Sequence, residues 1–197
     1  MLARLARAIS ILGHPLLVLP AALILPAALE GDDSATLRSI LLGFALFAAL
    51  VMSGSWWQVR RGRWAHIDAS EPSERHALNR TLLVAIAIGA LLAWLRLPTA
   101  DLAVALALSA GIVAVAMLCT QWCKLSLHVA FAVYAAGLLW SLGVSAVGAG
   151  LAFAGIVAWS RLRLSRHRPR DLVTGAIAGG VAAILDWAAL QWLQSTS

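Results

Sequence analysis

A short polar stretch between two apolar runs, residues 159–171, carries the most reactive set of side chains in this sequence. It holds five arginines together with His167 and Asp171. Guanidinium groups bind oxyanions bidentately, an imidazole acts as nucleophile or base, and a carboxylate can orient that imidazole. The four-residue spacing of His167 and Asp171 predicts that the carboxylate accepts from one ring nitrogen and leaves the other as a free lone pair. Pro169 favours a helix that starts there, with Asp171 in its first turn. This combination of groups is suited to phosphate chemistry.

A second polar cluster lies between two apolar runs at residues 121–128. It contains Lys124, which is the only lysine in the protein, followed by Ser126 and His128. A hydroxyl and an imidazole two residues apart, at the start of a helix, can bind a phosphate oxygen and deliver a proton to a leaving alkoxide. This cluster is therefore a second candidate for phosphate chemistry.

The first stretch resembles a known family signature. Ser160-Arg161, five residues, His167, three residues and Asp171 match the Ser-Arg-x5-His-x3-Asp pattern of the type-2 phosphatidic acid phosphatase family, whose relatives include the vanadium haloperoxidases. A basic juxtamembrane loop that fixes topology and contacts lipid phosphates is the other interpretation of the same residues.

Two further motifs of that family are matched in part, and in the family's order. Ser126 and His128 match its Pro-Ser-Gly-His motif, although leucines stand where the proline and glycine would be. Its Lys-x6-Arg-Pro motif survives only at Arg75, because Asp68 occupies the lysine position. The missing cation matters, since a phosphoryl transition state spreads negative charge over three oxygens. Lys124, Arg63 or Arg80 are the candidates to replace it.

The resemblance implies a hydrolase that removes phosphate from a membrane lipid without a metal or another cofactor. His167 would attack phosphorus and form a phosphohistidine, Asp171 would orient it, and His128 would protonate the leaving oxygen and then activate water. The phosphate-binding residues implied are Arg75, Lys124, Ser126, Ser160 and Arg161. Phosphatidic acid, phosphatidylglycerol phosphate and a polyprenyl phosphate or diphosphate are the lipids that suit such a site.

Composition places the chain in the membrane. Of its 197 residues 61% are hydrophobic and only 12% are charged, and the mean hydropathy is +0.86. The apolar residues lie in long runs, which is typical of a polytopic helical membrane protein. The formal net charge of +6 belongs to no soluble basic domain, so we expect anionic lipids or a phosphorylated lipid as partners and no nucleic acid.

The runs predict an all-α bundle of six to seven transmembrane helices in a single domain, residues 1–197. Residues 58–80 are too polar to cross and are predicted to form an interfacial amphipathic segment. Glycines four residues apart in the last run favour close helix packing, and Asp186 in that run is interpreted as a buried polar contact. The predicted helices cover residues 8–29, 37–57, 81–97, 101–121, 126–143, 145–160 and 171–193.

Helix counting also predicts a topology. Even numbers of crossings separate the polar segments 58–80, 121–127 and 160–171, so all three face one side of the membrane. That side holds all basic residues except Arg38 and Arg96, that is 15 − 2 = 13. The positive-inside rule then predicts a site that faces the cytoplasm. Members of the family that this sequence resembles more commonly present the site on the extracytoplasmic face, so the charge rule and the resemblance disagree. We expect an integral multi-pass protein of a bacterial inner membrane.

Two other functional classes remain open. An anion transporter would line its pathway with the same arginines, but it predicts inverted repeats, and the sequence shows none. A non-catalytic relative would act as a membrane scaffold or a lipid-binding protein that has lost the cation of the first motif. The oligomeric state and the identity of the lipid are not determined by these patterns.

Overall fold

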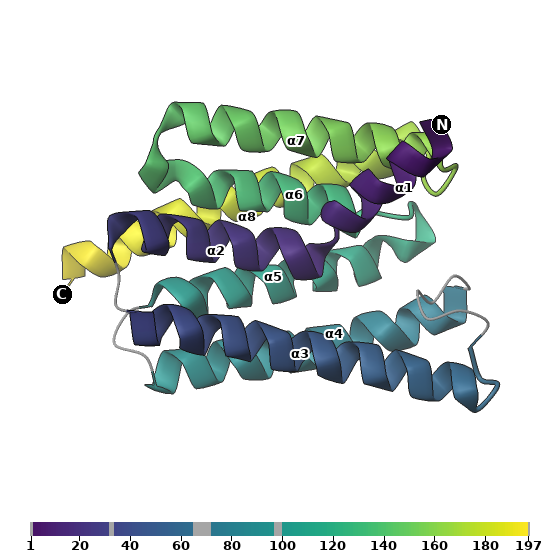
Figure 1. Ribbon diagram of the computed structural model, residues 1–197, viewed down its shortest axis with the longest axis horizontal. Helices are drawn as coiled ribbons and strands as arrows, with labels where there is room; N and C mark the ends of the chain where they lie inside the picture. The colour runs from purple at the N-terminus through teal and green to yellow at the C-terminus, as the bar shows by residue number, and fades with distance from the viewer. Residues whose placement is uncertain (1, 32–33, 65–71, 97–99, 197) are drawn as a thin grey trace.

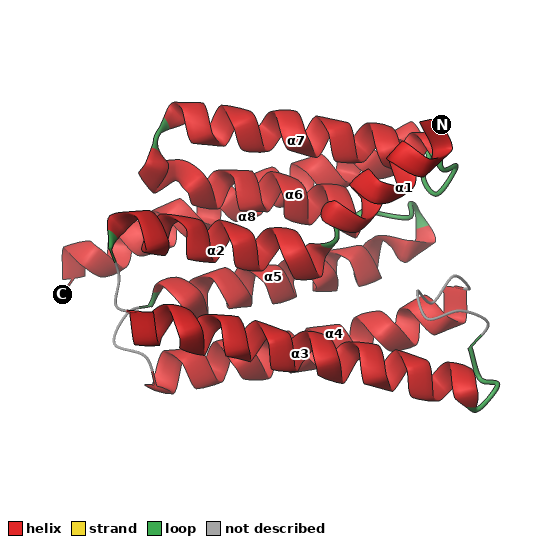
Figure 2. Ribbon diagram, in the orientation of Figure 1, coloured by secondary structure: helices red, strands yellow, loops and turns green. Residues whose placement is uncertain are grey.

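The computed structural model describes residues 2–31, 34–64, 72–96 and 100–196. This part of the chain is helical throughout apart from short connections, and it contains no strand (Figure 2). The predicted all-α polytopic bundle is therefore confirmed. Its helices, with η for short 3-10 turns, are α1 (Leu2–Leu12), α2 (Pro15–Glu30), α3 (Ser34–Arg60), α4 (Pro72–Arg96), α5 (Asp101–Leu118), η1 (Cys119–Gln121), α6 (Leu127–Leu138), η2 (Leu139–Leu142), α7 (Val144–Arg163) and α8 (Pro169–Thr196).

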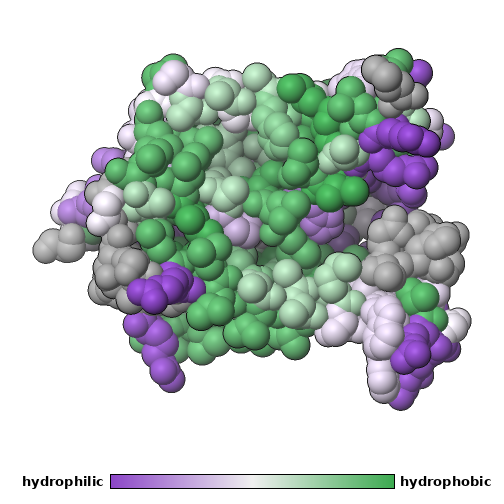
Figure 3. Space-filling model, viewed as in Figure 1, coloured by the Kyte–Doolittle hydropathy of each residue, from purple (hydrophilic) through white to green (hydrophobic). Residues whose placement is uncertain are grey.

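The helices have the length and surface of a membrane protein. Five described helices are long and apolar enough to cross a bilayer, and the bent pair α1–α2 makes six. The one predicted crossing that is too short for this class is residues 126–143, which correspond to the shorter apolar segment Leu127–Leu142. Apolar side chains cover the broad middle of the face shown in Figure 3, and hydrophilic residues gather at its two ends. A wide apolar belt between polar ends is what a lipid bilayer requires.

The sequence predicts one kinked helix over residues 8–29, interrupted at His14-Pro15, Pro20 and Pro26, and the structure places the bend at the first of these. Helicity begins at Leu2, stops at Leu12 and resumes at Pro15, with a bend of 55° between α1 and α2. His14 causes the restart, because its Nδ1 accepts a hydrogen bond from the backbone N–H of Leu16 at 3.2 Å and caps α2. Pro15 suits the first turn of that helix. Pro20 and Pro26 lie inside α2, which continues through both.

The predicted interfacial segment 58–80 is wrong over much of its described length. Residues 58–60 complete α3, and residues 72–80 form the first turns of α4. Pro72 at the start of α4 and Glu74 in its first turn favour helix initiation, which hydropathy alone does not indicate. Residues 65–71, which include Asp68, lie outside the described part of the chain. Because residues 72–80 are helical, Arg75 lies on a regular helix.

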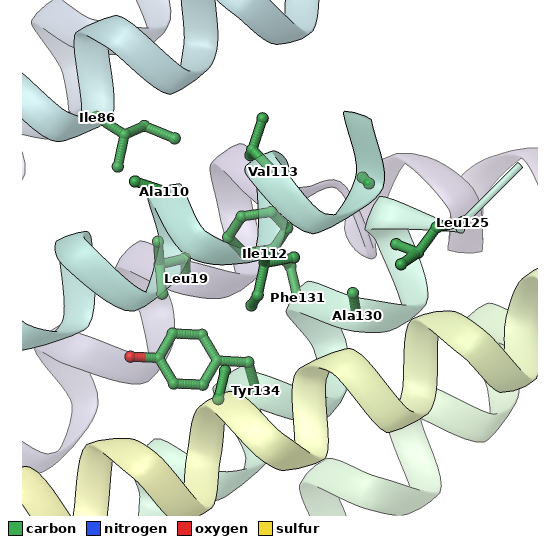
Figure 4. Packing of buried hydrophobic residues seen from close by; sticks show 11 residues of the cluster. Leu19, Ile86, Ala110, Ile112, Val113, Leu125, Ala130, Phe131 and Tyr134 are labelled. Carbon is green, nitrogen blue, oxygen red and sulfur yellow. The ribbon is translucent and has the colours of Figure 1, made fainter. Parts of the chain in front are cut away.

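The core forms around α6, which packs against α8, α7 and α2. Tyr134 of α6 is fully buried and lies beside Leu19, Ile112 and Phe131 (Figure 4). Its hydroxyl donates to Oδ1 of Asp186 at 2.9 Å. The interpretation of Asp186 as a buried polar contact is confirmed, since a phenol that donates to the carboxylate satisfies both groups away from water.

Close packing of α6 on α8 depends on two glycines. A Cβ at Gly175 would lie 2.7 Å from the carbonyl oxygen of Ser126, and one at Gly179 would collide with the carbonyl oxygen of Ala130. Gly180 differs, because no described atom lies within 4 Å of the position its Cβ would take. The predicted glycine packing is thus confirmed for the first two positions.

We expect Gly179→Ala to lower the free energy of unfolding by about 1–3 kcal/mol, because a methyl group forced against a backbone carbonyl must separate the two helices. Gly180→Ala is the matched control, and it should be neutral or stabilising by up to about 1 kcal/mol, since alanine favours a helix over glycine. Thermal unfolding of the two variants in detergent checks this. Equal melting temperatures would contradict the assigned contact.

Three distant parts of the chain meet at one end of the bundle. The C-terminal end of α3, the link between α5 and α6, and the turn between α7 and α8 all lie at the right in Figure 1, together with α1. This arrangement agrees with the prediction that the three polar segments share one side.

Candidate functional site

One carboxylate connects the turn between α7 and α8 to the link before α6 through hydrogen bonds. Asp171 is buried in the first turn of α8. Its Oδ2 accepts from the backbone N–H of Arg168 at 2.9 Å, and its Oδ1 accepts from the backbone N–H of Lys124 at 3.1 Å. Its own carbonyl accepts from the N–H of Ser126 at 3.0 Å. Asp171 therefore fixes the position of two segments that are far apart in sequence.

This fastening determines which nitrogen of His167 is free. Nδ1 of His167 lies 3.1 Å from the carbonyl oxygen of Lys124 and 3.8 Å from Oδ2 of Asp171. A carbonyl oxygen only accepts, so Nδ1 carries the proton and donates a hydrogen bond to the backbone carbonyl of Lys124. The hydrogen bond thus goes to a main-chain oxygen instead of the predicted Asp171, whose carboxylate acts on the ring through space. Nε2 keeps its lone pair, as a nucleophile requires.

His167 lies at the polar end of a large cavity, the chamber, of about 1740 Å³. The chamber walls are mostly apolar and follow α3 and α4 along much of their length, because α3 makes little direct contact with α4. The polar residues at the end near the α7–α8 turn are Ser10, His14, Arg75, His76, Lys124, His128, Arg161, Arg166 and His167.

A second cavity, the vestibule, shares part of its lining with the chamber, including His167. Its volume is about 590 Å³, and it is lined by residues 165–171 together with Lys124 and Leu162. Lys124, Arg166 and His167 line both cavities. His167 thus stands between an apolar space inside the bundle and a polar space at its end.

The positive charge around His167 is concentrated. Burial lowers the pKa of the Lys124 ammonium, and the neighbouring Arg75, Arg161 and Arg166 lower it further, while Asp171 opposes them. Burial, Arg161 and Lys124 likewise hold the pKa of His167 at about 4, below its ordinary value of 6.5. The imidazole is consequently neutral at physiological pH and keeps its lone pair.

We expect His167 to remain unprotonated until the pH falls to about 4, and Lys124→Met to move that pKa upward toward 6.5 because one of the charges that lower it is removed. Since the folded pKa lies below the unfolded one, the unfolded chain takes up the proton first. The free energy of unfolding should therefore fall as the pH drops from about 6.5 toward 4. Histidine NMR titration in phosphate-free buffer measures the pKa, and a folded-state value near 6.5 would contradict this account.

Arg161 is held in place by a residue from the other end of the chain. Its Nη1 donates to Oγ of Ser10 on α1 at 2.7 Å, and Ser10 is buried. The guanidinium lies at the polar end of the chamber. A planar group fixed in this way is suited to binding a phosphoryl group with two hydrogen bonds.

The structure brings together six of the eight predicted site residues. His128, Arg75, Lys124, Arg161 and His167 line the chamber, and Asp171 lines the vestibule. Of the candidates for the missing cation, Lys124 lines the chamber, whereas Arg63 and Arg80 do not. Asp68 lies outside the described residues.

Two predicted phosphate ligands do not reach either cavity. Ser160 is fully buried, and its hydroxyl donates to the carbonyl of Val157 at 2.7 Å within α7. Ser126 is also fully buried, and its hydroxyl has no hydrogen-bond partner among the described residues. Both side chains are enclosed by the surrounding protein, and neither lines the chamber or the vestibule.

Sequence reasoning misses three residues at this end of the chamber: Ser10, His14 and Arg166. The place of His14 beside a proline near a helix end favours a purely structural role. Its ring in fact meets that of His128 edge to face, with 5.2 Å between centroids and 86° between planes. No signal in the sequence relates these two residues, because the contact joins segments more than one hundred positions apart.

No group of three or more His, Cys, Asp or Glu side chains in the described part of the chain could hold a metal ion. Comparison with protein-family models, with curated proteins and with solved structures finds no match to this chain. Fold and site together define a polytopic helical membrane protein with a cationic, histidine-bearing site at one end.

Proposed function

We propose that this protein hydrolyses a phosphomonoester or diphosphate on a membrane lipid through a phosphohistidine intermediate, as a divergent relative of the type-2 phosphatidic acid phosphatases. One observation carries the proposal: a histidine with a free Nε2 stands among cations where an apolar chamber meets a polar vestibule. An apolar space accommodates lipid chains, and the cations at its end attract the phosphate group.

The proposed reaction uses the residues of this site in two steps. Nε2 of His167 forms a bond to phosphorus as the bond from phosphorus to the lipid oxygen breaks. His128 enters this step as the imidazolium, whose charge the bound phosphate favours, and it gives one proton to that oxygen and becomes a neutral imidazole. The lipid alcohol leaves. His128 then takes a proton from water, which attacks phosphorus and breaks the phosphorus–nitrogen bond, so that inorganic phosphate is released and His167 is restored.

Charge stabilisation comes from Arg75, Lys124, Arg161 and Arg166, which gather around the chamber's polar end. Preorganised donors of this kind stabilise the charge that develops on a transferring phosphoryl group. Arg75 comes from α4, Lys124 from the link before α6, and Arg161 and Arg166 from the end of α7 and the turn after it. Lys124, Arg161 and Arg166, which come from other segments than Arg75, would in this way replace the lysine absent from the first family motif.

The positive-inside rule supports a site on the cytoplasmic face, and a bacterial inner membrane is the location that we propose. Arg38 and Arg96 are the basic residues assigned to the opposite side, against thirteen at the site end. Phosphatidic acid, phosphatidylglycerol phosphate and polyprenyl phosphates or diphosphates are the substrates to test first.

The test is phosphate release by purified protein from a panel of these lipids in the presence of EDTA. Phosphate release at the same rate with and without EDTA supports the proposal. The lipid that is hydrolysed fastest identifies the substrate. No release from any member by folded protein would contradict it and would favour a scaffold or lipid-binding role.

A second function, transport of an amphipathic anion, is favoured by one observation. The chamber's lining on α4 runs from Arg75 at one end of the helix to Arg96 at the other. Reconstitution into liposomes distinguishes the two functions. Movement of a labelled lipid phosphate between leaflets without hydrolysis would support transport.

A further inference from the structure

The elbow between α1 and α2 belongs to the same site as Arg161 and His128. Gly13 in the elbow packs so closely on α7 that a Cβ there would lie 2.5 Å from a methyl carbon of Val157. Val157 is one helical turn before Arg161, to which Ser10 is hydrogen bonded at 2.7 Å. The elbow is thus fixed against the turn of α7 that presents the guanidinium.

The protonation of His14 follows from its hydrogen bond. Nδ1 accepts from the backbone N–H of Leu16 at 3.2 Å, and a nitrogen that accepts carries no proton. The ring is therefore neutral, and its one proton sits on Nε2. The helix N-terminus that His14 caps keeps the ring in this tautomer, since the other tautomer would set two N–H groups against each other.

The position of the ring is also fixed. His14 lines the polar end of the chamber and contacts the His128 ring edge to face at 5.2 Å. Arg161 from α7 and Lys124 from the link before α6 line the same chamber. A neutral N–H donor at this place adds a hydrogen bond for an anion without a further charge.

We propose that His14 is a phosphate-binding residue, whose Nε2–H donates to a non-bridging oxygen of the phosphoryl group. This inference rests on the proposed function for its substrate, but it concerns a group that the motifs do not include. His14 would supply one of the donors that a phosphoryl transition state needs in a site without the lysine of the first motif.

Three variants test this inference. His14→Phe keeps a ring against His128 and removes the N–H, and we expect kcat/KM for the lipid phosphate to fall about 100-fold. His14→Gln restores an N–H donor and should recover most of that loss. Leu12→Phe is the control, because it places a phenylalanine in the same elbow at an exposed position that lines neither cavity, and its kcat/KM should stay close to wild type. If His14→Phe does not fold, His14→Met, which also lacks an N–H, takes its place.

Binding of inorganic phosphate separates this inference from the proposed function. Titration calorimetry on wild type, His14→Phe and His14→Gln should show a Kd at least about 10-fold weaker for the phenylalanine variant alone. If the wild-type protein hydrolyses no lipid but His14→Phe still loses affinity for phosphate, the proposed function is overturned and the role of His14 in phosphate binding is kept. Equal hydrolysis and equal phosphate affinity in wild type and His14→Phe would overturn the role of His14 and keep the function.

Discussion

His167→Ala is expected to abolish phosphate release from lipid substrates, with a loss in kcat of about 1000-fold or more, because the variant has no atom that can form the bond to phosphorus. The structure gives this histidine the required state. Nδ1 is occupied by the Lys124 carbonyl, Nε2 is free, and the pKa near 4 keeps the ring neutral. A covalent intermediate provides a direct measurement, since phosphohistidine is labile in acid and stable in alkali. Wild-type protein quenched during turnover of radiolabelled substrate should carry such a label, and the variant should not.

Arg163→Ala is the matched control for this experiment. Arg163 lies four residues before His167 with an exposed side chain and lines neither cavity. It should fold, turn over and become labelled like wild type. Turnover by folded His167→Ala at the wild-type rate would show that His167 takes no part in the chemistry. The basic end of the bundle would then be better described as a lipid-binding surface.

Arg161→Lys is expected to lower kcat/KM by about 100- to 1000-fold, although it keeps the charge. A lysine ammonium is a point charge on a flexible chain, and it cannot present two parallel donors to a phosphoryl group. The guanidinium has a fixed place here, because Ser10 accepts from Nη1 at 2.7 Å. A lysine cannot keep the Ser10 contact and offer a fork of donors at the same time.

Arg163→Lys controls for the loss of an arginine near the end of α7. Arg163 is exposed and lines neither cavity, so the change should leave kcat/KM within about twofold of wild type. Steady-state kinetics with mixed micelles of substrate and detergent measures both variants. An Arg161→Lys protein as active as Arg163→Lys would show that positive charge alone is sufficient at this position.

The segments that bear the site are recognisable from the amino-acid sequence alone. Long apolar runs determine helices in a bilayer, because every backbone group in hydrocarbon must be hydrogen bonded within the chain. Counting those runs is enough to put residues 121–127 and 160–171 on one side. The spacing of His167 and Asp171 is also informative, since both belong to one turn whose geometry is local.

Local patterns are less reliable where a polar helix end extends beyond the membrane. Residues 72–80 have the charge of a surface segment, and hydropathy does not show that they continue α4. The interruptions at His14-Pro15, Pro20 and Pro26 predict a kink in the first helix without showing which of them bends it. The bend occurs at His14-Pro15, where the histidine caps the following helix.

The roles of individual side chains are decided by the tertiary structure. Ser126 and Ser160 match family motifs, but both are enclosed by the surrounding protein and neither lines a cavity. The partner of His167 Nδ1 is a carbonyl forty-three positions away, and the partner of Arg161 is a serine one hundred and fifty-one positions away. Composition and periodicity determine which segments are helical and which end of the bundle they reach, because those properties depend on neighbouring residues. Which atoms meet there depends on how distant helices pack, and the sequence carries that information only through the whole fold.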